Sequence, residues 1–243
     1  MIVFLFIGCD SENAFNCIKK EGTIIQTEIS VSSFDKIIVF RGVQLFIEEG
    51  SEQKVMLETG ENLLEDIEFK VENNTLLIID NTGCNFIRDY GTTKVIVITP
   101  NLIEIRNSSG FAVKSNGIIS FPNLTLLTDE DYLGEEFHTD GDFILNLDID
   151  ELKIISNGIS NYYLSGSANK AIIGFYAGDS RLEAENFLIN ELTIYHRGSN
   201  KMIVNPLNEL KGEIRGVGDV ISKNRPPIVE VEEFYTGRLI FDD

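Results

Sequence analysis

The sequence predicts an all-β protein, a right-handed parallel β-helix or β-solenoid with coils of about 20 residues and an N-terminal β cap. Three observations support this class: a glycine that returns at a regular interval, apolar residues that alternate with polar ones around each return, and no stretch with helical spacing. One such unit cannot bury its apolar face alone. We therefore expect the units to stack into one continuous core.

The glycine repeat fills the C-terminal half of the chain. The spacings between its members are 20, 20, 20 and 19 residues. We expect these glycines at corners where the chain adopts a positive φ or passes close to the neighbouring coil. They are Gly158, Gly178, Gly198, Gly218 and Gly237.

Alternating strands are expected on both sides of each glycine. With a fixed step of 20 residues, Ile154, Ile194 and Ile214 fall into one inward row. The same step aligns Leu152 with Ile172. An antiparallel meander with glycine turns is the alternative that produces similar alternation.

The N-terminal half has longer strands without this repeat. Asn73 and Asn74 predict a tight hairpin, because asparagine accepts the left-handed conformation that two-residue loops require. We expect this half, residues 24–100, to cover one end of the repeat coils at 101–243. The expected strands are 37–40, 43–47, 54–58, 67–71, 75–79 and 94–99.

The chain is strongly acidic. Its 243 residues carry 39 Asp and Glu against 20 Lys and Arg, a net charge of −19. This charge argues against nucleic acid or an anionic membrane surface as the partner, because both would be repelled. A solvated surface explains the charge, and calcium or a basic partner is the alternative explanation.

The first nine residues are an apolar run that ends at Cys9. They are too short for a membrane-spanning helix, which needs about 20 residues. They look like the end of a bacterial lipoprotein signal peptide, in which Cys9 becomes the acylated N-terminus and residues 10–23 a linker. This predicts an outer-membrane lipoprotein of the cell envelope, with a lipid at Cys9 as its only membrane contact. A buried edge strand is the alternative.

Two further cysteines, Cys17 and Cys84, leave the redox state open between free thiols and one disulfide. Neither has a second Cys or a His at the spacing of zinc ligands. No cofactor is expected.

Acidic residues gather between 128 and 151, together with His138. Such a group could bind Ca²⁺ or supply a general acid and base for sugar cleavage, but calcium-loop spacing is missing. Solvated corners are the simpler interpretation, so metal and catalytic residues are predicted as none. The weak calcium candidates are Asp140, Asp142, Asp148 and Asp150.

Short segments taken in order carry a resemblance to a known family. They are 34–37, 42–47, 63–64, 74–78, 95–102, 210–218 and 226–227. The chain resembles the GIN domain, which is the head domain of a family of auto-transporter adhesins. Gly42-Val43-Gln44 stands where that family has Gly-Ile-Asn. The resemblance covers about residues 24–243 and implies a secreted or lipid-anchored β-solenoid. It transfers no catalytic residue.

Two functions therefore compete. The first is a non-catalytic envelope protein that binds a surface polymer or another protein. The second is a polysaccharide-active enzyme, because parallel β-helices often carry such enzymes, although fold analogy is weak support.

The enzyme hypothesis lacks candidate residues. Asp179 and Asp219 follow two of the glycines and are expected about 10 Å apart, two coils away from each other. His196 is interpreted as a wall residue that shares its repeat position with Ser156, Tyr176 and Gly216. Four tyrosines could stack on sugar rings: Tyr162, Tyr163, Tyr176 and Tyr195.

Overall fold

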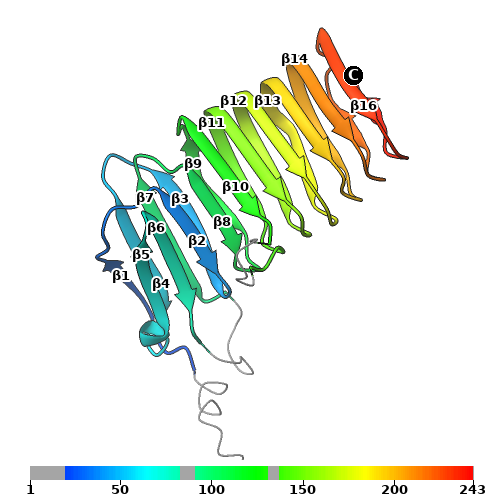
Figure 1. Ribbon diagram of the computed structural model, residues 1–243. Coiled ribbons are helices and arrows are strands. Elements are labelled where there is room, and N and C mark those ends of the chain that lie inside the picture. The colour runs from blue at the N-terminus through cyan, green and yellow to red at the C-terminus, as the bar shows by residue number, and fades with distance from the viewer. Residues whose placement is uncertain (1–19, 83–90, 131–136, 243) are drawn as a thin grey trace, which may run out of the picture.

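The computed structural model describes residues 20–82, 91–130 and 137–242. Within these ranges the fold is all-β: seventeen strands belong to one sheet, and a short 3-10 helix, η2 (Leu64–Asp66), joins two of them (Figure 1). The first seven strands are β1 (Ile24–Ile29), β2 (Lys36–Phe40), β3 (Val43–Glu49), β4 (Lys54–Gly60), β5 (Ile67–Glu72), β6 (Thr75–Asp80) and β7 (Thr93–Thr99). The remaining strands are β8 (Glu104–Ser108), β9 (Val113–Ile119), β10 (Asn123–Thr128), β11 (Phe143–Ser156), β12 (Asn161–Phe175), β13 (Arg181–His196), β14 (Met202–Ile214), β15 (Val220–Ser222), β16 (Ile228–Glu233) and β17 (Leu239–Phe241).

The N-terminal strands combine both pairing directions. β4 pairs antiparallel with β1 and β7, and β5 pairs antiparallel with β6. By contrast, β2 lies parallel between β6 and β8, and β3 lies parallel between β7 and β9. The antiparallel strands gather at one end of the molecule (Figure 1). The division at residue 100 stays a prediction.

The hairpin between β5 and β6 forms as predicted. Asn73 has φ 50° and Asn74 has φ 61°, and Glu72 pairs with Thr75 across the turn. Asparagine reaches this left-handed region at little cost, which explains why the turn needs no glycine.

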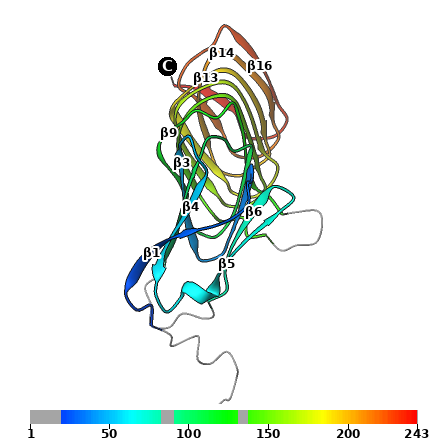
Figure 2. The same cartoon turned by 90° about the vertical axis from the view of Figure 1, so that its left-hand side faces the viewer.

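Strands β8 to β17 form a parallel stack. Their pairings with one another are all parallel, including those between β10, β11, β12, β13 and β14. Leu152 pairs with Ala171 in this direction, so the antiparallel meander is excluded for these strands. Figure 2 looks along the stack, where the strands lie one behind another.

The step between neighbouring strands departs from the predicted constant repeat in part of the stack. Ile154 and Ile194 do share an inward row, through Ile173. The next partner is Gly212 and not Ile214, which lies beside His196. The prediction for Ile214 was therefore wrong.

The β11–β12 pair keeps a step of 19 residues throughout, whereas irregular positions inside the strands change the step in the β12–β13 and β13–β14 pairs. The first half keeps the repeat, since Tyr162, Leu182 and Met202 are successive partners. The register then shifts after Tyr163 in the β12–β13 pair and after Glu183 in the β13–β14 pair. In the β12–β13 pair the step lengthens from 20 to 21 residues, as one extra residue in β13 produces. In the β13–β14 pair it falls from 20 to 17 residues and then rises to 18.

The repeated glycines allow neighbouring turns to approach closely. Gly178 has φ 80°, and a Cβ there would lie 2.1 Å from the carbonyl oxygen of Gly158. A Cβ on Gly218 would lie 2.0 Å from the carbonyl oxygen of Asn200. No heavy atom tolerates these distances, and a Cβ on Gly158 or Gly237 would lie 2.2 or 2.3 Å from a carbonyl oxygen. The predicted close approach is therefore confirmed at these four glycines, whereas the nearest atom to a Cβ on Gly198 would be 3.2 Å away.

The core is one continuous apolar cluster along the whole stack. Part of it is an inner aromatic row, in which the ring centroids of Phe143 and Tyr162 are 5.3 Å apart and those of Tyr162 and Phe175 are 5.6 Å apart. The Tyr162 hydroxyl is paired with Thr128 Oγ1 at 2.7 Å. Each layer therefore stabilises its neighbours through side chains as well as through the backbone.

Candidate functional site

Long strands of the stack bend where two successive residues both point outward. In β12 this happens at Ser165-Gly166 and at Asn169-Lys170, and in β13 at Glu185-Asn186 and Asn190-Glu191. Between the two bends the strands present a short outer face. Because the strands are in parallel register, the bends of neighbouring strands line up and this face continues along the stack.

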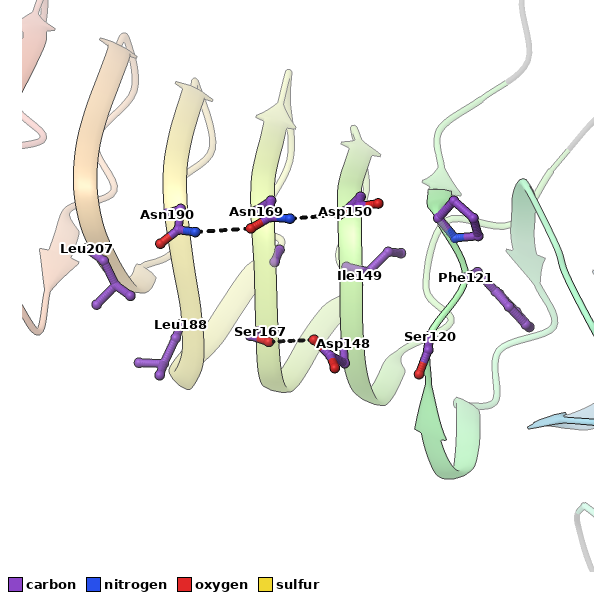
Figure 3. A pocket seen from close by; sticks show the side chains of 12 residues that line it. Ser120, Phe121, Asp148, Ile149, Asp150, Ser167, Asn169, Leu188, Asn190 and Leu207 are labelled. Atoms are coloured by element: carbon purple, nitrogen blue, oxygen red, sulfur yellow. Dashed lines mark hydrogen bonds between the residues drawn. The ribbon is translucent and has the colours of Figure 1, made fainter.

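A groove of about 400 Å³ lies on this short face (Figure 3). It crosses strands β11 to β14 and begins beside the segment between β9 and β10. We call it the outer groove. Its lining residues are Ser120, Phe121, Pro122, Asp148, Ile149, Asp150, Ser167, Ala168, Asn169, Leu188, Asn190 and Leu207.

One side of the outer groove is formed by hydrogen-bonded polar side chains that belong to a row continuing past the groove to Asn208, which we call the amide row. It consists of Asp150, Asn169, Asn190 and Asn208, one from each of four consecutive strands. Asn169 Nδ2 donates to Asp150 Oδ1 at 2.7 Å, Asn190 Nδ2 donates to Asn169 Oδ1 at 3.1 Å, and Asn208 Nδ2 donates to Asn190 Oδ1 at 3.4 Å. The first two bonds are drawn in Figure 3. Every amide thus has a fixed orientation.

The other side of the groove changes from polar to apolar along the stack. Ser167 Oγ donates to Asp148 Oδ1 at 2.8 Å. On the next strands Leu188 and Leu207 point into the same groove with 44% and 37% of their surface exposed (Figure 3). The groove is therefore amphipathic, with hydrogen-bonding groups and apolar surface side by side.

A second groove of about 360 Å³ lies on the neighbouring face of the same strands. Tyr163, 41% exposed, lines it together with Ile144, Glu183 and Asn186. The register of the β12–β13 strand pair shifts beside this groove, after Tyr163. It lacks a hydrogen-bonded row comparable to the amide row in the part of the chain that the structure describes.

The calcium candidates are not brought together. Asp148 and Asp150 lie in β11 and line the outer groove, whereas Asp142 Oδ1 accepts hydrogen bonds from the backbone and side-chain nitrogens of Asn161 at 2.7 and 3.0 Å. Asp140 lies near Gly110. Among the described residues, no three His, Cys, Asp or Glu side chains form a group that could hold a metal ion.

The two histidines have different surroundings. His138 is hydrogen-bonded to Arg41 through Nε2, and its backbone nitrogen donates to Ser108 Oγ at 2.7 Å. His196 is fully buried in the wall, where its Nε2 donates to the carbonyl oxygen of Asn200 at 2.9 Å. Burial lowers the pKa of His196, since the charged form loses its hydration.

The burial of His196 agrees with its interpretation as a wall residue. The residues predicted to align with it on the neighbouring strands were wrong. The partners of His196 are Phe175 and Ile214, not Tyr176 and Gly216. Its ring centroid is 5.9 Å from that of Phe175 in an edge-on contact. The cause is again that the number of residues between paired positions on neighbouring strands is not constant.

The four tyrosines are distributed over core and surface. Tyr162 is buried and cannot stack on a sugar, which corrects that prediction. Tyr176 and Tyr195 stack on each other with centroids 5.0 Å apart. Gly174 makes room for this pair, because a Cβ there would lie 2.4 Å from the Tyr176 ring.

The two aspartates that follow the glycines have separate partners. Asp179 Oδ1 accepts a hydrogen bond from Ser199 Oγ at 2.6 Å. Asp219 Oδ1 accepts one from the backbone nitrogen of Arg238 at 2.9 Å. The described contacts do not join the two carboxylates into a general acid and base.

Two predictions fall outside the described residues: lipidation at Cys9, and the pairing state of Cys17 and Cys84. In the described ranges no helical segment has the length and hydropathy of a membrane span.

The amide row was missed by the sequence analysis. The sequence separations between its successive members are 19, 21 and 18, so no constant step aligns them. The only signal in the sequence is that Asp or Asn recurs near the middle of four long strands.

Comparisons with known protein families give one match. A family model described as "Putative auto-transporter adhesin, head GIN domain" matches residues 33–226. No curated protein sequence is significantly similar to the chain.

Several solved structures have the same fold. A putative adhesin from Bacteroides fragilis is 19% identical, with a TM-score of 0.79, and the match covers 91% of this chain and 99% of that one. A putative adhesin from Parabacteroides merdae is 16% identical, with a TM-score of 0.65 and coverage of 93% and 99%. A protein from Parabacteroides distasonis called a putative lipid binding protein is 15% identical, with a TM-score of 0.64 and coverage of 93% and 100%. At these identities the likeness establishes the fold alone.

Proposed function

Because this chain belongs to the putative auto-transporter adhesin, head GIN domain family, we propose that it is a non-catalytic binding module of the bacterial cell envelope. Its partner is a surface polymer or another protein. The family match over residues 33–226 is the observation that carries this proposal. The adhesin-like role of the family supports a location at the cell surface or in the envelope.

The architecture supports a binding role. We infer that the parallel strands wind as a right-handed β-solenoid, because right-handed crossovers between parallel strands are strongly favoured. A solenoid presents long, regular outer faces on a rigid core, and such faces suit extended ligands. The outer groove lies on one of these faces and is our candidate for the binding site.

The membrane connection is also a proposal. A lipid on Cys9 would tether the domain to the outer membrane, while residues 10–23 serve as a linker. One acyl chain holds a protein only reversibly, so anchoring requires the several chains of a lipoprotein.

Binding without turnover is the test of this function. The full chain carrying Cys9→Ser, which keeps the protein free of lipid, would be immobilised and exposed to envelope polysaccharides and envelope proteins, with and without calcium. Saturable binding with no release of new reducing ends or unsaturated sugar products supports the proposal. Product release, or no saturable binding to any of these partners, contradicts it.

A further inference from the structure

We propose that the outer groove binds a linear glycan whose sugars carry no carboxylate or sulfate group. The glycan lies along the stack and crosses strands β11 to β14. This inference rests on the proposed binding function and names the ligand class of its candidate site.

The direction of the groove decides against a peptide bound as an added strand. Strands β11, β12 and β13 each have parallel partners on both sides, so none of them is a free edge of the sheet. A peptide that augments a sheet needs a free strand edge. A ligand in this groove therefore cannot bind as an added strand, and the side chains that line the groove are its main contacts.

The amide row offers hydrogen-bonding groups at a regular interval. Neighbouring strands lie about 4.8 Å apart, so equivalent groups repeat at this distance along the groove. Asn169 and Asn190 each use one N–H and one oxygen lone pair within the row. Each amide therefore keeps a second N–H and a second lone pair for a ligand. A chain of hydroxyl-bearing units, which both donate and accept, matches this arrangement.

The charges of the groove define which glycans fit. Asp148 and Asp150 each use one carboxylate oxygen, which leaves the other without a partner in the part of the chain that the structure describes. These oxygens accept hydrogen bonds from hydroxyl or ammonium groups. None of the 12 lining residues is basic. Uronic acid and sulfated polymers would meet two uncompensated carboxylates and be repelled.

The apolar side of the groove completes the match. Leu188 and Leu207 lie beside the amide row, and both are substantially exposed. A sugar ring has hydroxyl groups at its edge and C–H groups on its faces, so it can contact both sides at once. Burying these leucines also supplies the hydrophobic contribution that a purely polar site lacks.

Three probes test the inference on the full chain carrying Cys9→Ser: a neutral β-glucan hexasaccharide, a chitosan hexamer and polygalacturonate. Isothermal titration calorimetry would compare this protein with a variant that also carries Asn169→Ala and Asn190→Ala. Asn205→Ala is the matched control, because Asn205 donates to the carbonyl oxygen of Glu185 and does not line the outer groove. Circular dichroism verifies that the parent protein, the double variant and the Asn205→Ala control have the same fold.

We expect the neutral or the amino-sugar probe to bind, and the double variant to bind it roughly tenfold more weakly, since each lost hydrogen bond lowers affinity severalfold. Asn205→Ala should bind as the parent does, and polygalacturonate should not bind. Equal affinity of all variants, or equal binding of polygalacturonate, would overturn the groove assignment while leaving the binding function intact. Binding to an envelope protein without binding to any glycan would also overturn the groove assignment and leave the binding function intact. Cleavage of a probe would instead overturn the proposed non-catalytic function.

Discussion

Replacing Ile173 with alanine tests the register of the parallel stack. Ile173 is fully buried between Ile154 and Ile194. Its neighbour Ile172 points outward and is half-buried. The constant repeat expected from the glycine spacing would instead align Ile172 with the buried Leu152. The two alanine variants therefore distinguish the structure from the simple repeat.

The expected costs differ by several fold. Ile173→Ala removes three buried carbon groups, worth about 0.8 kcal/mol each, and leaves a cavity between layers that cannot collapse freely. We expect a loss of about 3 to 4 kcal/mol in the free energy of unfolding. Ile172→Ala removes the same atoms from a half-solvated site and should cost less than about 1 kcal/mol.

Thermal and denaturant unfolding, followed by far-ultraviolet circular dichroism, measure both variants against the parent chain. For a domain of this size each kcal/mol lowers Tm by about 2 to 4 °C, so Ile173→Ala should lower Tm by roughly 6 to 16 °C. The dependence of the free energy on denaturant should keep its slope. Equal costs for the two variants, or a greater cost for Ile172→Ala, would refute the register.

Three further outcomes are expected. A palmitate analogue should label the precursor expressed from its natural start, and Cys9→Ser should abolish the label; label that persists in this variant would disprove lipidation there. The chain should release no reducing ends from pectin or alginate, and release that disappears in Asp179→Asn would show catalysis. Burial lowers the pKa of His196 below its ordinary value of 6.5, so the unfolded state binds the proton first and stability should fall as pH decreases below about 6.5, by at most about 1.4 kcal/mol per pH unit. His196→Gln should remove this dependence, and an unchanged pH profile in that variant would assign it to other groups.

Local features of the fold could be predicted from the sequence. The expected strand 43–47 lies within β3, and the expected strand 54–58 lies within β4. The Asn73-Asn74 turn was likewise predictable, because its conformation depends only on residues beside it in the chain. Alternation of apolar and polar residues is a local signal of the same kind.

The outer groove could not be predicted. Asn169 and Asn190 meet because the step from β12 to β13 lengthens by a single position at the bulge that follows Tyr163. A bulge has no strong sequence signature, and it changes the pairing partner of every later residue of the strand. The candidate site therefore depends on the irregular positions, which a regular repeat leaves out.

The sequence by itself determined the strands, their approximate period, the family and the acidic charge, since these follow from local alternation, spacing and composition. Only the tertiary structure decided which residues face each other across layers. Side chains in a strand alternate between core and surface, so a shift of one residue exchanges the two sets. For this reason Ile173 lies in the core and Ile172 outside it, and for the same reason four polar side chains with unequal spacing align in one hydrogen-bonded row.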